Sequence, residues 1–223
     1  TLIDAARAEE LYGRMGPGVE VSGGSAANTL AGLASLGGRG AFIGKVRDDQ
    51  LGEVFTHDIR AAGTMYETTP ALEGPSTARC LVLVTPDAQR TLQTFLGVSV
   101  ERGPEDVDPA LVRGAQVTYL EGYLFDPPRA KAAFREAVEI AHGAERRVAL
   151  TLSDPFCVDR HRADFLALIE GHVDILFANK AEILSLYEVQ DFDSALQHVR
   201  GHCDVAALTR GEKGAVIVAG EEV

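Results

Sequence analysis

The chain has 223 residues, about one and a half times the usual domain length, so one large domain, or one domain with a small appendage, is expected. Apolar residues make up 46% and charged residues 24%, a globular composition that excludes disordered, collagenous and membrane classes. The 21 Lys and Arg against 33 Asp and Glu give a formal charge of −12. This excludes nucleic acid and anionic membranes as expected partners, because both require a basic surface. A phosphate ligand would have to be bound by individual groups in its immediate surroundings, because the overall charge is negative.

The three cysteines, Cys80, Cys157 and Cys203, are too far apart in sequence for a zinc motif or a disulfide framework. We therefore expect buried thiols in a cytoplasmic protein. The N-terminal residues show no basic region followed by an apolar segment, and the longest apolar runs have strand length, so neither a signal peptide nor a membrane span is predicted within these residues. The chain begins without Met and ends where a strand is starting, so the natural protein is expected to extend beyond both ends.

Three helices and one strand are predicted before residue 64. Ser25 is expected to cap the second helix, and Asp48 or Asp49 the third. The run AFIGKV has the composition of a strand. The first helix is predicted at residues 1–15, the second from its cap at Ser25 to Gly37-Gly38, the third from its cap to Gly63, and the strand at residues 41–46.

Residues 64–96 follow a different pattern, with three strand-like runs and no helix between them. The runs are MYET, TARCLVLVT and RTLQTF, and a turn at residues 86–89 joins the last two. The economical interpretation is a small antiparallel sheet, which could act as a lid.

From residue 117 strands and helices alternate strictly, which indicates βαβ crossovers and a parallel sheet covered by helices on both faces. The predicted fold class is therefore α/β, with a Rossmann-like, mostly parallel sheet and a small β-sheet lid. We expect residues 1–63 and 97–223 to form the core and residues 64–96 the lid.

Polar or glycine-bearing segments follow four consecutive predicted strands. Because ligands bind outside the carboxyl ends of the strands in an open parallel sheet, these segments indicate a binding edge. Ordinary turn and cap chemistry is the alternative, since the same residue types suit both. The segments begin at Glu121, Ser153, Asn179 and Thr209.

Asn179 and Glu182 are three residues apart at a helix start, near the positive end of the helix dipole. The pair suits a hydrated magnesium ion and phosphate oxygens, although a reciprocal capping box is, for the pair alone, the stronger explanation. The segment from Thr209 to Gly214 links two strands, and its glycines let backbone N–H groups approach a ligand. A hairpin turn explains that segment equally well.

The glycine pair Gly23-Gly24 precedes a helix, and a backbone without Cβ atoms lets a hydroxyl-rich ligand lie against it. Asn28 lies one turn into that helix and faces the same end. Asn is unfavourable inside a helix, so its presence needs an explanation. Two glycines before a helix are, by themselves, more often structural.

Four stretches resemble the ribokinase family, also called the PfkB family of carbohydrate kinases, and within it the adenosine-kinase-like branch. The first is specific, because the glycine pair, asparagine, helix and glycine-rich strand keep the family's order. The similarity runs along nearly the whole chain. The stretches are GGSAANTLAGLASLGGRGAFIGKVRDDQLG (23–52), LSDPFCVDRHR (152–162), the N-x-x-E at 179–182 and TRGEKGA (209–215).

The resemblance implies a ribokinase-like fold, a sugar or nucleoside as acceptor, and ATP and Mg²⁺ as cofactors. It leaves open whether a monovalent cation binds and whether the protein is a homodimer. The LSDPF stretch favours a nucleoside over a hexose as the acceptor. The residues implied to bind the acceptor are Gly23, Gly24, Ser25, Asn28 and Glu121. Those implied to bind the nucleotide are Asn179, Thr209 and Gly211, with Glu182 organising magnesium through water.

The sequence departs from the family at both ends. The family's catalytic apparatus ends in an Asp-Thr-x-Gly-Ala-Gly-Asp type segment, which forms the anion hole and supplies the base, and no such segment occurs in these 223 residues. The family's first strand, with an Asp that contacts the sugar, is also missing before Thr1. No catalytic residue is therefore assigned within the chain, and the base is expected beyond Val223.

The expected activity is transfer of the γ-phosphoryl group of ATP to a primary hydroxyl of a sugar or nucleoside. The alternative is a non-catalytic sugar- or nucleoside-binding protein that retains the pocket and lacks the base. A doubly wound enzyme with another nucleotide cofactor is disfavoured, because no G-x-G-x-x-G follows a strand.

Overall fold

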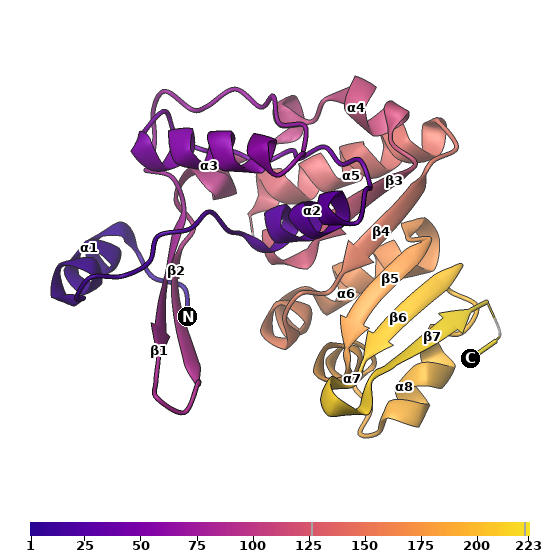
Figure 1. Cartoon of the computed structure of the whole chain (residues 1–223). Coiled ribbons are helices and arrows are strands. Elements are labelled where there is room, and N and C mark those ends of the chain that lie inside the picture. The colour runs from indigo at the N-terminus through magenta and orange to yellow at the C-terminus, as the bar shows by residue number, and fades with distance from the viewer. Residues whose placement is uncertain (126, 221) are drawn as a thin grey trace. The chain divides into compact units, whose positions relative to one another are not determined.

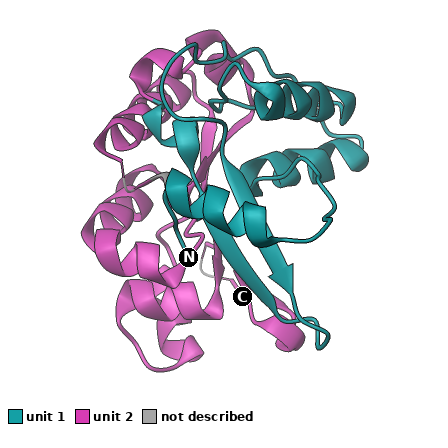
Figure 2. Ribbon diagram, turned by 90° about the vertical axis from the view of Figure 1, so that its left-hand side faces the viewer, with its two compact units in different colours: residues 1–102 teal, residues 103–223 magenta. Residues whose placement is uncertain are grey.

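The computed structural model describes residues 1–125, 127–220 and 222–223. These residues form two units, unit 1 (residues 1–102) and unit 2 (residues 103–223), which Figure 2 colours separately. Figure 1 labels the helices and strands within them.

Unit 1 contains the three predicted helices, and two of them are capped by a preceding aspartate. The Asp4 carboxylate accepts a hydrogen bond from the backbone N–H of Arg7 (2.8 Å), and the Asp49 carboxylate accepts one from the N–H of Gly52 (2.9 Å). The helices are α1 (Ala5–Arg14), α2 (Ser25–Ser35) and α3 (Gln50–Ala61).

The start of α2 differs from the prediction. Gly24, not Ser25, is the residue before the first turn, and no side chain among the described residues hydrogen-bonds that turn. The φ angle of Gly24 is 107°, which glycine adopts readily and other residues do not. The chain therefore enters the helix at Gly24, Ser25 is already helical, and the prediction that Ser25 caps α2 is wrong.

An aromatic cluster forms the core of unit 1. The rings of Phe42, Phe55 and Tyr66 pack against one another with centroids 5.7 Å apart. Tyr66 is only 1% exposed, and its hydroxyl donates a hydrogen bond to the carbonyl of Gly44 (3.1 Å). Burial raises the pKa of Tyr66 to about 12, so the phenol keeps its proton and its hydrogen bond at neutral pH. The aliphatic members of this core are Ala27, Val46 and Ile59.

Residues 41–46 and 65–68 are extended but do not form the strands that the sequence predicts. Among the described residues, one isolated parallel bridge pairs Ala41 with Met65 at the start of the two segments, and another pairs Arg47 with Ala71 beyond their ends. Between the bridges, the carbonyl of Ile43 accepts from the Arg102 guanidinium (2.8 Å), and the next carbonyl accepts from the Tyr66 hydroxyl. Side chains thus take carbonyl groups that a strand ladder would use, and both strand predictions are wrong.

A β-hairpin confirms the predicted small antiparallel sheet. Strands β1 (Arg79–Val84) and β2 (Arg90–Phe95) pair along their full length of six residues. The turn between them is closed by a hydrogen bond from the N–H of Thr85 to the carbonyl of Gln89 (3.0 Å). The assignment of residues 64–96 as a lid, separate from a core of the remaining residues, stays a prediction.

Asp49 joins the start of α3 to the segment before β1. Its carboxylate accepts from the backbone N–H of Thr77 (2.9 Å) and from the Thr77 hydroxyl (2.6 Å), and Thr77 is 6% exposed. Burial alone would raise the pKa of Asp49, but the hydrogen bonds from Thr77 and Gly52 hold it below its usual value. Asp49 is therefore an ionised acceptor at neutral pH.

Unit 2 is built on a five-stranded sheet with strand order β3-β4-β5-β6-β7. Strands β3 to β6 are parallel, and β7 pairs antiparallel with β6. The leucines on one face of the sheet are buried, including Leu150, Leu176 and Leu208, each 0% exposed. The strands are β3 (Val117–Glu121), β4 (Arg147–Thr151), β5 (Ile175–Asn179), β6 (Val205–Thr209) and β7 (Ala215–Ala219).

Helices connect the parallel strands in the predicted βαβ order. Helix α5 packs against β3 and β4, α7 packs against β5 and β6, and α6 and α8 pack against α7. The predicted α/β class, with a mostly parallel sheet and a small antiparallel sheet, is therefore confirmed. The α-helices are α4 (Pro109–Gly114), α5 (Pro128–Gly143), α6 (Pro155–His172), α7 (Lys180–Tyr187) and α8 (Phe192–Val199). The 3₁₀ helices are η1 (Gly97–Glu101), η2 (Pro104–Asp106), η3 (Gly122–Phe125) and η4 (Gly211–Lys213).

In the part of the chain that the structure describes, every helix is too short or too polar to cross a membrane.

Candidate functional site

The site residues predicted from the sequence fall in both units. Those in unit 1 are Gly23, Gly24, Ser25 and Asn28. Those in unit 2 are Glu121, Asn179, Glu182, Thr209 and Gly211. Each group is described within its own unit.

The unit 1 group forms an open surface at the start of α2. Gly23, Gly24, Ser25 and Asn28 are all exposed, and the carbonyl of Gly24 accepts the hydrogen bond from the N–H of Asn28 (2.8 Å). A Cβ atom on Gly23 would meet nothing within 4 Å, so the space beside Gly23 is free within the described structure, and one on Gly24 would lie 3.9 Å from the Cβ of Ala27. Exposed amide, hydroxyl and backbone groups of this kind can hydrogen-bond the hydroxyls of a small ligand.

The neighbouring Ser22 fixes the glycine segment to another helix. Its hydroxyl donates to the Asp58 carboxylate on α3 at 2.6 Å. This hydrogen bond and the one from the neighbouring His57 hold the pKa of Asp58 below its usual value. Asp58 is thus an ionised acceptor at neutral pH, and Ser22 holds the segment that leads into Gly23.

The unit 2 group lies at the carboxyl edge of the parallel sheet. Glu121 at the end of β3 pairs in register with Thr151 at the end of β4, and Asn179 at the end of β5 pairs with Thr209 at the end of β6. The prediction that these strand ends share one edge is therefore confirmed. The structure brings Asn179 and Thr209 directly beside each other.

The edge is tightly packed between β3 and β4. A Cβ atom on Gly122 would lie 2.7 Å from the carbonyl oxygen of Leu152, so only glycine fits at this close approach. Ser153, which follows Leu152, has a φ angle of 67°, a strained value for a non-glycine residue. Backbone strain of this kind is concentrated at functional sites, which supports the edge as a binding region.

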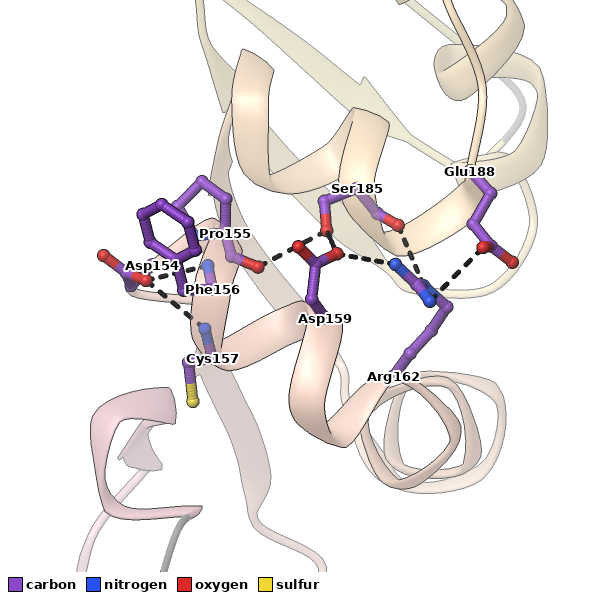
Figure 3. A network of polar contacts seen from close by, with 8 residues as sticks. All are labelled: Asp154, Pro155, Phe156, Cys157, Asp159, Arg162, Ser185 and Glu188. Carbon is purple, nitrogen blue, oxygen red and sulfur yellow. Dashed lines mark hydrogen bonds and ion pairs between the residues drawn. The ribbon is translucent and has the colours of Figure 1, made fainter.

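Asp154, the residue before α6, is a further acidic residue of this edge. Asp154 caps the helix by accepting from the N–H groups of Phe156 (2.8 Å) and Cys157 (3.3 Å), as Figure 3 shows. The same figure shows Asp159 accepting from the Ser185 hydroxyl (2.6 Å) and from Arg162 (2.6 Å), which joins α6 to α7. The helix that presents Asp154 is therefore anchored to the helix that carries Glu182.

Asn179 and Glu182 form a complete capping box at the start of α7. The Asn179 side-chain oxygen accepts from the N–H of Glu182 (2.9 Å), and the Glu182 carboxylate accepts from the N–H (2.9 Å) and the side-chain amide (2.6 Å) of Asn179. Glu182 is only 5% exposed. Burial raises the pKa of Glu182, and the negative charge of Asp154 adds to the rise. Of the two interpretations left open by the sequence, the capping box is present, and the magnesium role stays a prediction.

Tyr123 lies close enough to the carboxylates of this edge for their charges to affect it. Its side chain is 47% exposed, and burial of the rest, together with the charges of Asp154, Glu121 and Glu182, raises its pKa. The sequence placed Tyr123 and Asp154 in the strand-end segments of the predicted binding edge because both closely follow strand ends. It gave neither residue a specific role.

The turn after β6 places Thr209 and Gly211 at the same edge. Both residues are exposed, and Gly211 has a φ angle of 61°. A hydrogen bond from the N–H of Arg210 to the carbonyl of Gly214 (2.7 Å) closes the turn, and β7 follows antiparallel to β6. The segment is thus a hairpin turn, and its exposed glycine backbone also remains open to a ligand.

The described residues contain no cluster of three or more His, Cys, Asp or Glu side chains that could hold a metal ion. Magnesium, however, is usually held by one or two carboxylates together with waters and phosphate oxygens. Glu182 and Asp154, acidic and close enough for their charges to interact, fit that mode of binding.

The sequence model described as the pfkB family of carbohydrate kinases matches residues 1–223. A curated ATP-dependent ribose-1-phosphate kinase from Halopiger xanaduensis is 31% identical over 194 residues, which cover 83% of this chain and 61% of that protein. The chain spans about three fifths of the length of the curated relatives it matches.

Two solved structures are more similar to this chain. The crystal structure of an adenosine kinase from Sinorhizobium meliloti has a TM-score of 0.94 at 58% identity and covers 99% of this chain and 68% of that one. A probable sugar kinase from Rhizobium etli CFN 42 has a TM-score of 0.95 at 55% identity and covers 99% and 67%. The ribokinase-like fold implied by the resemblance is thereby confirmed.

Proposed function

Because the chain belongs to the pfkB family of carbohydrate kinases, we propose that its protein transfers the γ-phosphoryl group of ATP to a primary hydroxyl of a sugar or nucleoside. The observation that carries the proposal is the carboxyl edge of the unit 2 sheet, where Asn179 and Thr209 are paired neighbours and Glu182 follows one helical turn later. An amide, a hydroxyl and a buried carboxylate beside a glycine turn suit a magnesium-bound triphosphate.

We assign the acceptor to the unit 1 group. Gly23 and Gly24 offer a backbone without Cβ atoms, and Asn28 and Ser25 offer exposed polar side chains at the start of α2. These groups can hydrogen-bond several hydroxyls of a ribose or hexose. The acceptor role of Glu121, at the end of β3 in unit 2, stays a prediction from the family resemblance.

We assign the nucleotide to the turn after β6 and the start of α7. Thr209 donates through its hydroxyl, Gly211 through its backbone N–H, and Asn179 lies beside Thr209 on the next strand. Glu182 and Asp154 would hold magnesium through its waters, and the bound ion would neutralise charge on the phosphates. The residues of the chain itself bind and orient the nucleotide, and none of them is assigned as the base.

We propose a purine nucleoside as the acceptor class. Its support is the LSDPF stretch and the 58% identity to the adenosine kinase from Sinorhizobium meliloti. Phe125, which the sequence places beside the pocket edge, is 4% exposed and packs on Phe134 and Phe165, so it belongs to the core rather than to a base-binding surface. The side chain of Leu124 lies outside the described residues.

Phosphate transfer from ATP should be measured with the natural protein and magnesium against adenosine, ribose, fructose, fructose 6-phosphate and ribose 1-phosphate. We expect adenosine to give the highest kcat/KM. Preference for a phosphorylated sugar would contradict the nucleoside proposal and leave the kinase proposal intact. Binding of an acceptor without transfer to any of them would identify the protein as the non-catalytic binding protein.

Asn28→Ala is expected to weaken acceptor binding about five- to tenfold and to leave ATP affinity nearly unchanged, because one hydrogen bond to a hydroxyl is worth about 1 kcal/mol or somewhat more. Calorimetry with each ligand separately measures both affinities. Thr29→Ala is the matched control, since its hydroxyl is exposed on the same helix and already donates to the carbonyl of Ser25 (3.0 Å). Equal losses for both ligands in a folded Asn28 variant would remove the assignment.

The cytoplasmic location, the homodimer and the monovalent cation stay predictions from sequence and resemblance.

A further inference from the structure

The turn after β6 is attached to α8 through a cation–π contact. The guanidinium of Arg210 lies over the ring of Phe192, 4.4 Å from its centroid. Phe192 is the first residue of α8 and is 6% exposed, so the ring is held in the core and offers a fixed surface. A guanidinium stacked on a buried aromatic face is a specific and partly desolvated interaction.

The position of this guanidinium depends on the ring. Within the described residues, the Nε atom of Arg210 is buried without a hydrogen-bond partner. A guanidinium stacks on aromatic faces as well as pairing with carboxylates. Among the described residues, the contact with Phe192 is the interaction that orients it.

The backbone of Arg210 closes the turn. Its N–H donates to the carbonyl of Gly214 (2.7 Å), and its carbonyl accepts from the N–H of Lys213 (3.2 Å). Gly211 and Gly214 have φ angles of 61° and 76°, so two of the residues in the turn are glycines in the left-handed region. Glycine has more conformational freedom to lose than any other residue, so the shape of this turn depends on its anchors.

Arg210 lies between the two residues assigned to the nucleotide, Thr209 and Gly211. We propose that Arg210 is a positioning residue: by stacking on Phe192 it holds the turn in the shape in which the Thr209 hydroxyl and the Gly211 N–H meet the nucleotide. The proposal rests on the function proposed above. A preorganised turn binds more tightly because less conformational freedom is lost on binding.

The test compares the natural protein with Arg210→Ala, Phe192→Leu and the double variant. The affinity for a non-hydrolysable ATP analogue with magnesium, the affinity for adenosine, and thermal unfolding are measured for each. We expect both single variants to weaken the analogue about five- to tenfold, as loss of one such contact implies, with adenosine affinity unchanged. The double variant should bind the analogue no more weakly than the weaker-binding single variant does, because the two single substitutions remove the same contact.

Arg113→Ala is the control. It removes one positive charge from an exposed residue in the last turn of α4, outside the residues assigned to either ligand, so its affinity for the analogue should stay near that of the unaltered protein. Should Arg210→Ala fail to fold, Arg210→Gln, which keeps most of the side-chain length without the charge, takes its place. Faster amide exchange across residues 210–214 in the ligand-free variant is expected as an independent sign of a loosened turn.

The outcomes separate this role from the proposed function. No binding of the analogue by the unaltered protein would overturn both. Binding that Arg210→Ala leaves unchanged would overturn the positioning role alone. A loss in Arg210→Ala without a loss in Phe192→Leu would also overturn it, since it would mean that the guanidinium contacts the nucleotide directly. Equal losses for analogue and adenosine with a lower unfolding temperature would reduce Arg210 to a structural residue.

Discussion

Replacing Glu182 by glutamine is expected to lower phosphate transfer at limiting magnesium roughly 10- to 100-fold, with acceptor affinity nearly unchanged. The Glu182 carboxylate is 5% exposed and is held by the side-chain amide and the backbone N–H of Asn179. A carboxylate fixed in this way can order the waters of a magnesium ion, and glutamine has neither the charge nor a second accepting oxygen.

The stability of the glutamine variant should change much less than its activity. Burial raises the pKa of Glu182 and Asp154 adds to the rise, so the folded state disfavours the ionised form. Glutamine removes that cost and loses one hydrogen bond, worth about 1 kcal/mol, so the two effects oppose each other. The pKa of Glu182 is higher in the folded state than in the unfolded state. The free energy of unfolding of the unaltered protein therefore falls as the pH rises from the unfolded-state pKa to the folded-state pKa. The variant should lack this fall.

Activity as a function of magnesium concentration, beside thermal unfolding, checks the Glu182 prediction. Asp108→Ala is the control, because Asp108 caps α4 by accepting from the N–H groups of Ala110 (2.8 Å) and Leu111 (3.3 Å) and has no assigned role in binding. It should lose about 1 kcal/mol of stability with unchanged magnesium dependence. A glutamine variant with normal magnesium dependence would show that the capping box is the whole role of Glu182.

Gly52→Ala is expected to destabilise unit 1 by about 3 kcal/mol or more. A Cβ atom on Gly52 would overlap the carbonyl oxygen of Arg47, which belongs to the backbone and cannot rotate away. The same Cβ would lie 3.1 Å from the Thr77 hydroxyl, which is bonded to Asp49. The methyl group would therefore displace the first turn of α3 together with its cap.

Urea unfolding of the natural protein and the variant measures the effect of Gly52→Ala. Gly32→Ala is the matched control, because Gly32 is also helical, lies in the same unit, and has nothing within 4 Å of an added Cβ. That control should gain up to about 1 kcal/mol from helix propensity. If both variants have the same free energy of unfolding as the parent, the close approach at Gly52 does not affect the stability of the protein.

Much of the most specific sequence stretch, residues 23–52, is structural. Gly52 ends the stretch that most closely resembles the family, yet its role is close packing, and Asp49 in the same stretch is a cap bonded to Thr77. The exposed residues assigned to the acceptor, such as Gly23, Gly24 and Asn28, all lie at the beginning of the stretch. A motif match therefore indicates the fold more directly than it indicates contact with a ligand.

The alternation of strands and helices in unit 2 could be predicted because each element has its own local signal. Caps such as Asp154 and Asn179 directly precede their helices, and the buried strands are short apolar runs. The failure at residues 41–46 has a different origin. Their carbonyl groups are bonded by the side chains of Arg102 and Tyr66, which are distant in sequence and leave no mark on the local pattern.

The location of the candidate site could be predicted to the same extent as the fold of unit 2. The shared edge follows from the alternation of strands and helices, so the amino-acid sequence alone places Asn179 and Thr209 at one edge of the sheet. The proximity of Asp154 to Glu182 and the stack of Arg210 on Phe192 could not be predicted, because each joins elements whose separation depends on packing. One sequence without its relatives contains no signal for such pairs.

The capping box at α7 also limits what the start of that helix can give to an anion. The first N–H groups of a helix have no partner within it, and they are the usual donors to a bound phosphate. In α7 the N–H of Asn179 is already taken by the Glu182 carboxylate and that of Glu182 by the Asn179 side chain, which leaves those of Lys180 and Ala181. The anion-binding capacity of this helix is thus two donors rather than four. In the nucleotide site proposed above, further donors would be supplied by the turn after β6.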